Sequence, residues 1–218
     1  MSLLNDERAV AAAGDAPVTN RPPREARIAR AARNDAARLA ASLSTAFYDD
    51  PVFRWFSPDD HRRGAMLPDF FDVFVHAYLS HGEAYTDDAV SGAALWAAPH
   101  TDPLSAEPVY AERLEEIAGV DAARLFEIVE LLEAHSPHER HYHLQVLGVL
   151  PERQGAGLGS ALMAPILQRC DRDGMPAYLE ATSARNRALY ERHGFRAHGD
   201  IPLPGGPALW RMWRDPVV

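Results

Sequence analysis

Residues 149–162 read VLPERQGAGLGSAL, and this stretch decides how the rest of the chain is interpreted. An apolar run ends at a proline, and three glycines then fall at every second position, at 155, 157 and 159. The segment that follows, SALMAPILQRC, has the apolar spacing of a helix. Glycines this close to a helix start indicate that a negatively charged group approaches the backbone, because free N–H groups face it and no side chain obstructs it.

Three interpretations of a phosphate-binding loop compete here. A Walker-type loop requires Lys and then Ser or Thr after its last glycine, whereas Gly159 is followed by Ser160 and Ala161. A dinucleotide fingerprint requires G-x-G-x-x-G in the first parallel unit, whereas this spacing is G-x-G-x-G and lies late in the chain. The third interpretation is a pyrophosphate held by the N–H groups of the loop and the first helical turn, with Arg153 adding charge. A loop whose glycines serve backbone geometry alone is the alternative.

The composition limits the partners that the chain can have. Its 218 residues are 47% hydrophobic and carry a formal net charge of −9, which argues against nucleic-acid binding because that requires clustered cations. No apolar run approaches the ~20 residues of a membrane span, so we expect no membrane partner. The single cysteine, Cys170, excludes an intramolecular disulfide and fits a reducing compartment, so we expect a cytoplasmic protein.

The order of predicted elements indicates one α/β domain. Residues 1–24 mix Ala, Gly, Pro and charge and read as a flexible leader, and 25–218 form the domain. Strands are expected at 25–30, 83–87, 89–97, 141–149, 177–181, 195–201 and 208–213. Helices are expected at 36–48, 59–80, 108–118, 121–134, 158–173 and 185–193. Pro68 lies inside the longest of these helices and predicts a kink or a division into two pieces.

Two spaced motifs make residues 141–214 resemble the GNAT superfamily of N-acetyltransferases. The acetyl-CoA loop of that superfamily follows Q/R-x-x-G-x-G/A, and residues 154–159 read QGAGLG. Downstream, ALYERHGF at 188–195 resembles the superfamily's closing Tyr-x-x-x-Gly-Phe segment. Within the superfamily the chain is similar to puromycin N-acetyltransferase-like proteins. The resemblance implies the α/β (α+β) GNAT fold, a mixed central sheet of about six to seven strands with helices on both faces and strands 4 and 5 splayed.

The resemblance also implies where acetyl-CoA binds. The expected contacts are Leu147, Gly148, Val149, Arg153, Gln154, Gly155, Ala156, Gly157, Leu158, Gly159, Ser160 and Asn186. Residues 147–149 would align the pantetheine arm like an added strand, and the N–H of Val149 or a neighbour would bond the thioester oxygen. Many members carry Asn seven residues before the tyrosine, where this chain has Ser183. Asn186 is therefore the expected contact, with a helix-start or turn role as the alternative.

The expected general acid is Tyr190. Acetyl transfer requires a proton for the leaving thiolate, and a phenol with a pKa of ~10 remains protonated at neutral pH. The alternative for Tyr190 is a ring that packs beneath the sheet without a chemical role.

Two residues are candidates for the general base. A histidine suits deprotonation of an ammonium, and His143 lies on the strand that precedes the glycine loop. Strand alternation would place four side chains on one face: His141, His143, Gln145 and Leu147. An exposed or hydrogen-bonded strand histidine is the alternative. Glu180, at the end of the facing strand, would serve as base or bind the substrate ammonium, against a salt bridge with an arginine such as Arg185.

The acceptor pocket is expected near the segment DDPVFRWF at 49–56. In the GNAT fold the segment after the first helix commonly walls the acceptor site. Phe53, Trp55 and Phe56 would then stack on an apolar substrate while Asp50 attracts its amine. The alternative is a buried helix junction with Asp50 as a cap.

These expectations combine into a function. The resemblance predicts an acetyl-CoA-dependent N-acetyltransferase that acts by direct attack on a primary amine of a small molecule such as an antibiotic or a metabolite. Peptide or protein N-acetylation and a non-catalytic acyl-CoA sensor are the alternatives. The four histidines at 135, 138, 141 and 143 match no zinc spacing, so no metal is expected. A monomer or a homodimer is expected.

Overall fold

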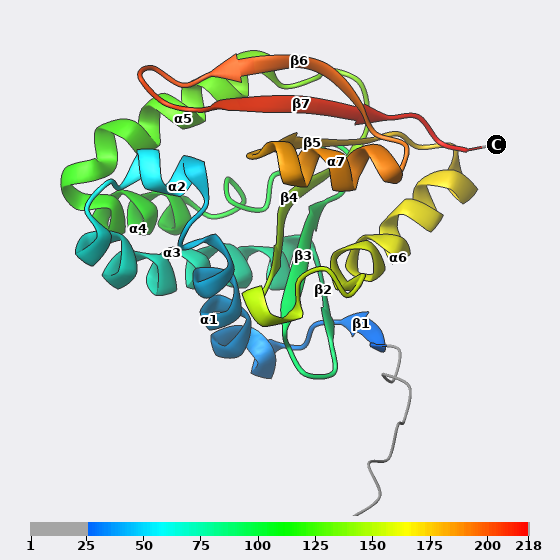
Figure 1. The fold of residues 1–218 in the computed structure, drawn as a ribbon, viewed down its shortest axis with the longest axis horizontal. Helices are drawn as coiled ribbons and strands as arrows, with labels where there is room; N and C mark the ends of the chain where they lie inside the picture. The colour runs from blue at the N-terminus through cyan, green and yellow to red at the C-terminus, as the bar shows by residue number, and fades with distance from the viewer. Residues whose placement is uncertain (1–25, 218) are drawn as a thin grey trace, which may run out of the picture.

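The structure is a computed structural model that describes residues 26–217. It contains a seven-stranded sheet with the strand order β1-β2-β3-β4-β5-β7-β6 (Figure 1). The strands are β1 Ile28–Arg30, β2 Glu83–Asp87, β3 Gly92–Ala97, β4 Tyr142–Val149, β5 Ala177–Ala181, β6 Arg196–Pro202 and β7 Ala208–Arg214. All neighbouring strands are antiparallel except β4 and β5, which are parallel. The predicted mixed sheet is confirmed, whereas the predicted leader, 1–24, lies outside the described residues.

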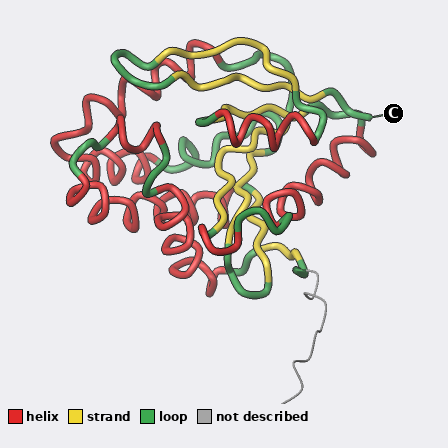
Figure 2. The backbone as a smooth tube through the Cα atoms, in the orientation of Figure 1, coloured by secondary structure: helices red, strands yellow, loops and turns green. Residues whose placement is uncertain are grey.

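Helices cover both faces of this sheet (Figure 2). They are α1 Ala36–Phe47, α2 Pro51–Phe56, α3 Asp60–His81, α4 Pro108–Ala118, α5 Ala122–His135, α6 Leu158–Asp173 and α7 Ala184–Arg192. Successive strand residues point to opposite faces, so β3 sends Leu95 into a core shared with α1 and α3 and Trp96 into a core shared with α6. The expected arrangement of helices on both faces is confirmed.

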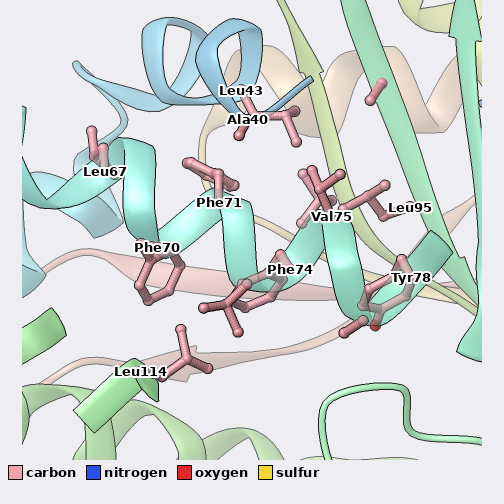
Figure 3. Close-up of a cluster of buried hydrophobic side chains, with 14 of the residues drawn as sticks. Ala40, Leu43, Leu67, Phe70, Phe71, Phe74, Val75, Tyr78, Leu95 and Leu114 are labelled. Atoms are coloured by element: carbon pink, nitrogen blue, oxygen red, sulfur yellow. The ribbon is translucent and has the colours of Figure 1, made fainter. Parts of the chain in front are cut away.

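The core on the α1 and α3 side is rich in aromatic residues. Helix α3 contributes a row of buried side chains at helical spacing (Figure 3): Leu67, Phe70, Phe71, Phe74, Val75 and Tyr78. Pro68 lies within α3, which continues through it as a single element of 22 residues, so the predicted division into two helices is wrong. The proline removes one backbone hydrogen bond, but apolar residues packed on both sides of it hold the helix in one piece.

Strand β4 contains one extra residue relative to β3. Leu95 pairs with Val146 and Trp96 pairs with Leu144, so Gln145 has no counterpart and forms a β-bulge. Because the count of residues shifts by one there, Leu144 packs into the α6-side core whereas Val146 packs into the α1-side core. The bulge therefore exchanges the two faces of β4 halfway along its length.

This exchange corrects one expectation from the sequence. His143 lies before the bulge on the face opposite Leu144, but Leu147 lies after the bulge and packs against the same α6-side core as Leu144. The predicted sharing of one face by His141, His143, Gln145 and Leu147 is thus wrong for Leu147. Simple alternation fails there because a bulge shifts every later side chain to the other face.

The parallel strands β4 and β5 part soon after they meet. Only Tyr142 and His143 of β4 are in register with β5, opposite Ala177 and Tyr178. From residue 144 to 149, β4 has no strand partner on that edge among the described residues, while β5 stays paired with β7 along its other edge. Figure 1 shows β4 turning away from β5. The predicted splay of these strands is confirmed, and it leaves a wedge-shaped opening in the sheet.

Candidate active site

A cavity of about 420 Å³, here called the loop cavity, lies between the free end of β4, the glycine-rich loop and α7. It is lined by Ala46, Phe47, Asp50, Leu147, Gly148, Val149, Arg153, Gln154, Gly155, Gly157, Leu158, Gly159, Ser160, Arg185, Asn186, Leu189, Tyr190 and Arg192. All the residues expected to contact the cofactor are among them except Ala156. The structure therefore brings together residues from one strand edge, one loop and three helices, α1, α6 and α7.

The glycine-rich loop adopts angles that favour glycine. Gly155 has φ +77° and Gly157 has φ +83°, and a Cβ added at either would meet no atom within 4 Å. Both positions therefore need glycine for the left-handed backbone rather than to avoid a protein side chain. Gly157 is the N-cap of α6 and supplies no side-chain cap, so the first N–H groups of that helix stay free for an anion. At Gly159 a Cβ would lie 3.4 Å from Leu189 Cδ2, which is an ordinary van der Waals contact.

The free edge of β4 directs backbone donors into the opening. Tyr142 N–H donates to Pro176 O on the β5 side, whereas Leu150 N–H donates to Ser91 O on the β3 side. Backbone N–H groups alternate between the two edges of a strand, so the N–H groups of residues 147 and 149 point away from β3 and into the opening. The Gln154 Nε2 donates to Val149 O at 3.0 Å and ties the loop to the end of this edge.

Three arginines supply positive charge to the loop cavity. Arg153 comes from the loop, and Arg185 and Arg192 come from α7. None of the three has a carboxylate within salt-bridge distance in the part of the chain that the structure describes. The sequence prediction missed Arg185 and Arg192 as cavity residues. Their signal was helical spacing, since 185, 189 and 192 fall on one face of α7.

Tyr190 reaches the loop cavity from α7. Its ring is buried, 6% exposed, and packs edge-to-face with Phe195 at a centroid distance of 6.0 Å. Burial, with the negative charge of Asp50, raises the pKa of Tyr190 well above the usual phenol range. The ring thus packs in the core, as one alternative expected, and lines the cavity with a phenol that keeps its proton.

Asp50 links α2 to the loop cavity. Its carboxylate accepts from Val52 N–H at 2.9 Å as the N-cap of α2, and from the Thr182 hydroxyl at 2.5 Å. Burial raises the pKa of Asp50, although these hydrogen bonds oppose that rise. Asn186 Nδ2 donates to the same threonine oxygen at 3.3 Å, and the Ser183 hydroxyl caps α7 by accepting from Asn186 N–H. Asp50 therefore acts as the cap that one alternative expected.

The aromatic residues after α1 lie in the core. Trp55 and Phe56 are 8% and 3% exposed, and Trp55 Nε1 donates to Pro204 O at 3.0 Å. Phe53 packs edge-to-face against Phe47 and Phe70. None of the predicted acceptor aromatics lines the loop cavity or the second cavity described below. The geometry agrees with a buried helix junction at this segment.

His143 and Glu180 form a hydrogen-bonded pair where β4 and β5 part. His143 Nε2 lies 2.8 Å from Glu180 Oε2, and their side chains are 24% and 10% exposed. Burial alone would raise the pKa of Glu180, but the charge and hydrogen bond of His143 outweigh it and lower that pKa. The carboxylate is therefore ionised and orients the imidazole. The two candidate bases form one unit, and Arg185 is not the partner of Glu180.

A second cavity of about 470 Å³, here called the helix cavity, receives this pair. It lies against α4, α5 and the loop that follows β3, and it contacts β4 through His143 and Gln145. The two cavities share no lining residue, yet both reach β4, one on each side of the bulge. Sequence reasoning missed the helix cavity, because its walls come from segments that lie far apart in the chain.

Within the described residues, 26–217, no group of three or more His, Cys, Asp or Glu side chains is arranged to hold a metal ion. No helix in that part of the chain has both the length and the apolar character needed to span a bilayer.

Residues 45–195 match the Acetyltransferase (GNAT) family. An uncharacterised N-acetyltransferase of Schizosaccharomyces pombe is 28% identical over 179 residues, covering 76% of this chain and 72% of that protein. The crystal structure of a "histone acetyltransferase HPA2 and related acetyltransferase" from Corynebacterium glutamicum has a TM-score of 0.68 and 29% identity, over 88% of this chain and 96% of that one. A Drosophila melanogaster polyamine N-acetyltransferase that forms N-acetylagmatine shares the fold, with a TM-score of 0.61 and 17% identity over 88% and 100% of the two chains.

Proposed function

The chain belongs to the GNAT acetyltransferase family and is an N-acetyltransferase, and on this premise we propose that it transfers acetyl from acetyl-CoA to a primary amine of a small molecule. The observation that carries the proposal is the unpaired edge of β4, which has a cationic cavity on one side and a paired acid and base on the other. A donor and an acceptor can thus approach the same strand from opposite faces of the sheet.

The residues of the loop cavity fit acetyl-CoA. The N–H groups at the start of α6 suit a pyrophosphate, and the three arginines, Arg153, Arg185 and Arg192, add charge for phosphate groups. The free N–H groups of residues 147 and 149 suit the amide-containing arm, which would lie along β4 like an added strand. The coenzyme supplies an activated thioester, and one of these N–H groups would stabilise the oxygen as negative charge develops.

The residues around the opening suit direct transfer. Glu180 accepts from His143 Nε2, so His143 Nδ1 takes a proton from the ammonium of the acceptor. The freed nitrogen attacks the thioester carbonyl carbon, the C–N bond forms and the C–S bond breaks. Tyr190 then donates its proton to the leaving thiolate, because its raised pKa keeps the phenol protonated until that step. The second proton of the attacking nitrogen passes to the Tyr190 phenolate, and His143 releases the first to solvent. The products are an acetamide and free coenzyme thiol.

The size of the helix cavity favours a small acceptor over a polypeptide. About 470 Å³ lies within the range of roughly 300–1,000 Å³ that is typical of small-molecule sites. Its walls come from two helices, the loop after β3 and the segment at 136–141, and it includes the paired His143 and Glu180.

The test is direct detection of the product by mass spectrometry, with release of coenzyme thiol measured in parallel over a panel of amines. We expect Tyr190→Phe to lower kcat by about 10²–10⁴-fold while the Kd for acetyl-CoA changes little, since the hydroxyl serves the departing thiolate. Tyr110→Phe is the matched control, because Tyr110 lines neither cavity. Acetyl-CoA binding without acetylation of any amine would contradict the proposed function, and an unchanged kcat in Tyr190→Phe would remove that residue from the mechanism.

A further inference from the structure

The chemistry of the helix cavity narrows the acceptor. Resting on the proposed function, we infer that the acceptor is a primary monoamine with an apolar body and no carboxylate, bound in the helix cavity with its nitrogen at His143 and Glu180. Three features of this cavity carry the inference: the sign of its charge, its apolar wall and its buried polar end.

Every fully charged side chain that lines the helix cavity is acidic. The carboxylates are Asp102, Glu133, Glu139 and Glu180, no lining residue is arginine, and the chain contains no lysine. Asp102, Glu133 and Glu139 are exposed at the rim, whereas Glu180 lies at the inner end. A cation is therefore attracted along the whole path, while a substrate carboxylate would meet only like charge and histidines. This selects amines over amino acids.

The middle of the helix cavity is apolar. Helices α4 and α5 supply Leu114, Leu125, Phe126, Val129 and Leu132 to its wall. Phe126 and Val129 are 47% and 39% exposed, and α5 has no buried residue. Phe126 and Val129 are thus left open at the cavity, while Leu125 and Leu132 also pack against the core, and a hydrocarbon body of the acceptor would cover the two exposed side chains. These five side chains carry no polar group, so the second ammonium of a short diamine that lay beside them would lose water without gaining a carboxylate contact there.

The inner end of the cavity offers polar groups that suit one nitrogen. Tyr78, at the end of the α3 row in Figure 3, is 1% exposed and lines the helix cavity. Burial, with the charges of Asp102 and Glu180, raises its pKa well above the phenol range, so this hydroxyl remains a donor and an acceptor. Gln145, set into the cavity by the bulge, lies at the same end. His143 is the last β4 residue paired with β5, so a nitrogen held there faces the opening between the strands.

The experiment compares kcat/KM for matched acceptors at saturating acetyl-CoA. The pairs are 2-phenylethylamine with phenylalanine and 3-methylbutylamine with leucine, and 1,4-diaminobutane tests a second charge. We expect each apolar amine to exceed its amino acid by on the order of 100-fold, and to exceed the diamine by roughly 10-fold or more. A preference for amino acids or for the diamine would overturn the inference while leaving the proposed function in place.

A pair of variants tests the wall itself. Phe126→Asp should lower kcat/KM for 2-phenylethylamine about 10-fold through KM, and leave 1,4-diaminobutane unchanged or improved. Val120→Asp is the control, because Val120 is 80% exposed and lines neither cavity. Equal effects of the two variants would overturn the inference. Amine binding to the coenzyme complex is measured by calorimetry in parallel. If the apolar amines bind more tightly than the amino acids and the diamine but none is acetylated, the cavity assignment is supported and the proposed function is contradicted.

Discussion

Replacing Gly157 by alanine should separate the role of the loop from the stability of the fold. Gly157 has φ +83° and ψ 0° at the start of α6, and its Cβ would point into open space. The same helix ends at Gly174, which has φ +63° and ψ 31° and an equally open Cβ position, but lines neither cavity. Gly157→Ala and Gly174→Ala therefore impose a similar backbone cost at the two ends of one helix, and only the first alters the loop cavity.

The expected magnitudes follow from the geometry. A non-glycine residue in the left-handed region costs about 1–2 kcal/mol, so each variant should lower Tm by roughly 2–8 °C. At Gly157 the methyl group also projects toward the space where a pyrophosphate would meet the N–H groups of the first helical turn. Loss of one charge-assisted hydrogen bond is worth about 1.5–3 kcal/mol, which is about 10- to 150-fold in Kd.

The assay is isothermal titration of acetyl-CoA into each variant, with thermal unfolding measured on the same samples. We expect similar Tm losses in both variants and a weakened Kd in Gly157→Ala alone. A wild-type Kd in folded Gly157→Ala would refute the loop as the pyrophosphate site. An equal loss of affinity in Gly174→Ala would refute it as well, because the effect would then come from the helix as a whole.

Two further predictions concern packing and pH. Gly148→Ala should lower the free energy of unfolding by about 1–3 kcal/mol in denaturant titrations, because its Cβ would lie 2.6 Å from Leu43 Cδ2 and 2.9 Å from Phe47 Cε2. Gly64→Ala is the control and should not be destabilising, because its Cβ would meet only Tyr48, at 3.4 Å. Burial and the charge of Asp50 raise the pKa of Tyr190, so the phenol stays protonated at pH values above the ordinary phenol pKa. We therefore expect that titration of Tyr190 does not lower kcat between pH 8 and pH 10. A kcat that falls to half near pH 10 would indicate a phenol with an ordinary pKa.

The elements of the fold were largely predictable because their signals are local. The apolar spacing of the α3 row and the run HYHLQVLGV each fix an element within a few residues. The glycine loop was also readable, since a left-handed residue before a helix demands glycine at 157. The sequence could not show that Ala156 lies outside the lining of the loop cavity, because this depends on the direction in which one side chain points.

The rest could not be predicted because it depends on segments that meet only in three dimensions. The bulge at Gln145 is defined by the register of β4 against β3, and the residues around it carry no sequence signal for an extra residue. The pairing of His143 with Glu180 required both strands to be placed, so the two had to remain separate candidates. The aromatic segment at 53–56 suggested a substrate wall, but composition alone does not distinguish such a wall from the core that these rings form with α3.

The extra residue in β4 makes the number of residues in that strand important, as well as their identity. Any substitution at Gln145 preserves the residue count, so His143 and the edge at 147–149 keep their separate faces. Deleting Gln145 would remove the bulge, because Leu144 and Val146 already pair with adjacent β3 residues and already lie on opposite faces. Leu147 would then stay on the α6 side, and the side chain lost would be the one that Gln145 places in the helix cavity. The extra residue therefore supplies the helix cavity with a side chain that a regular strand of the same register would lack.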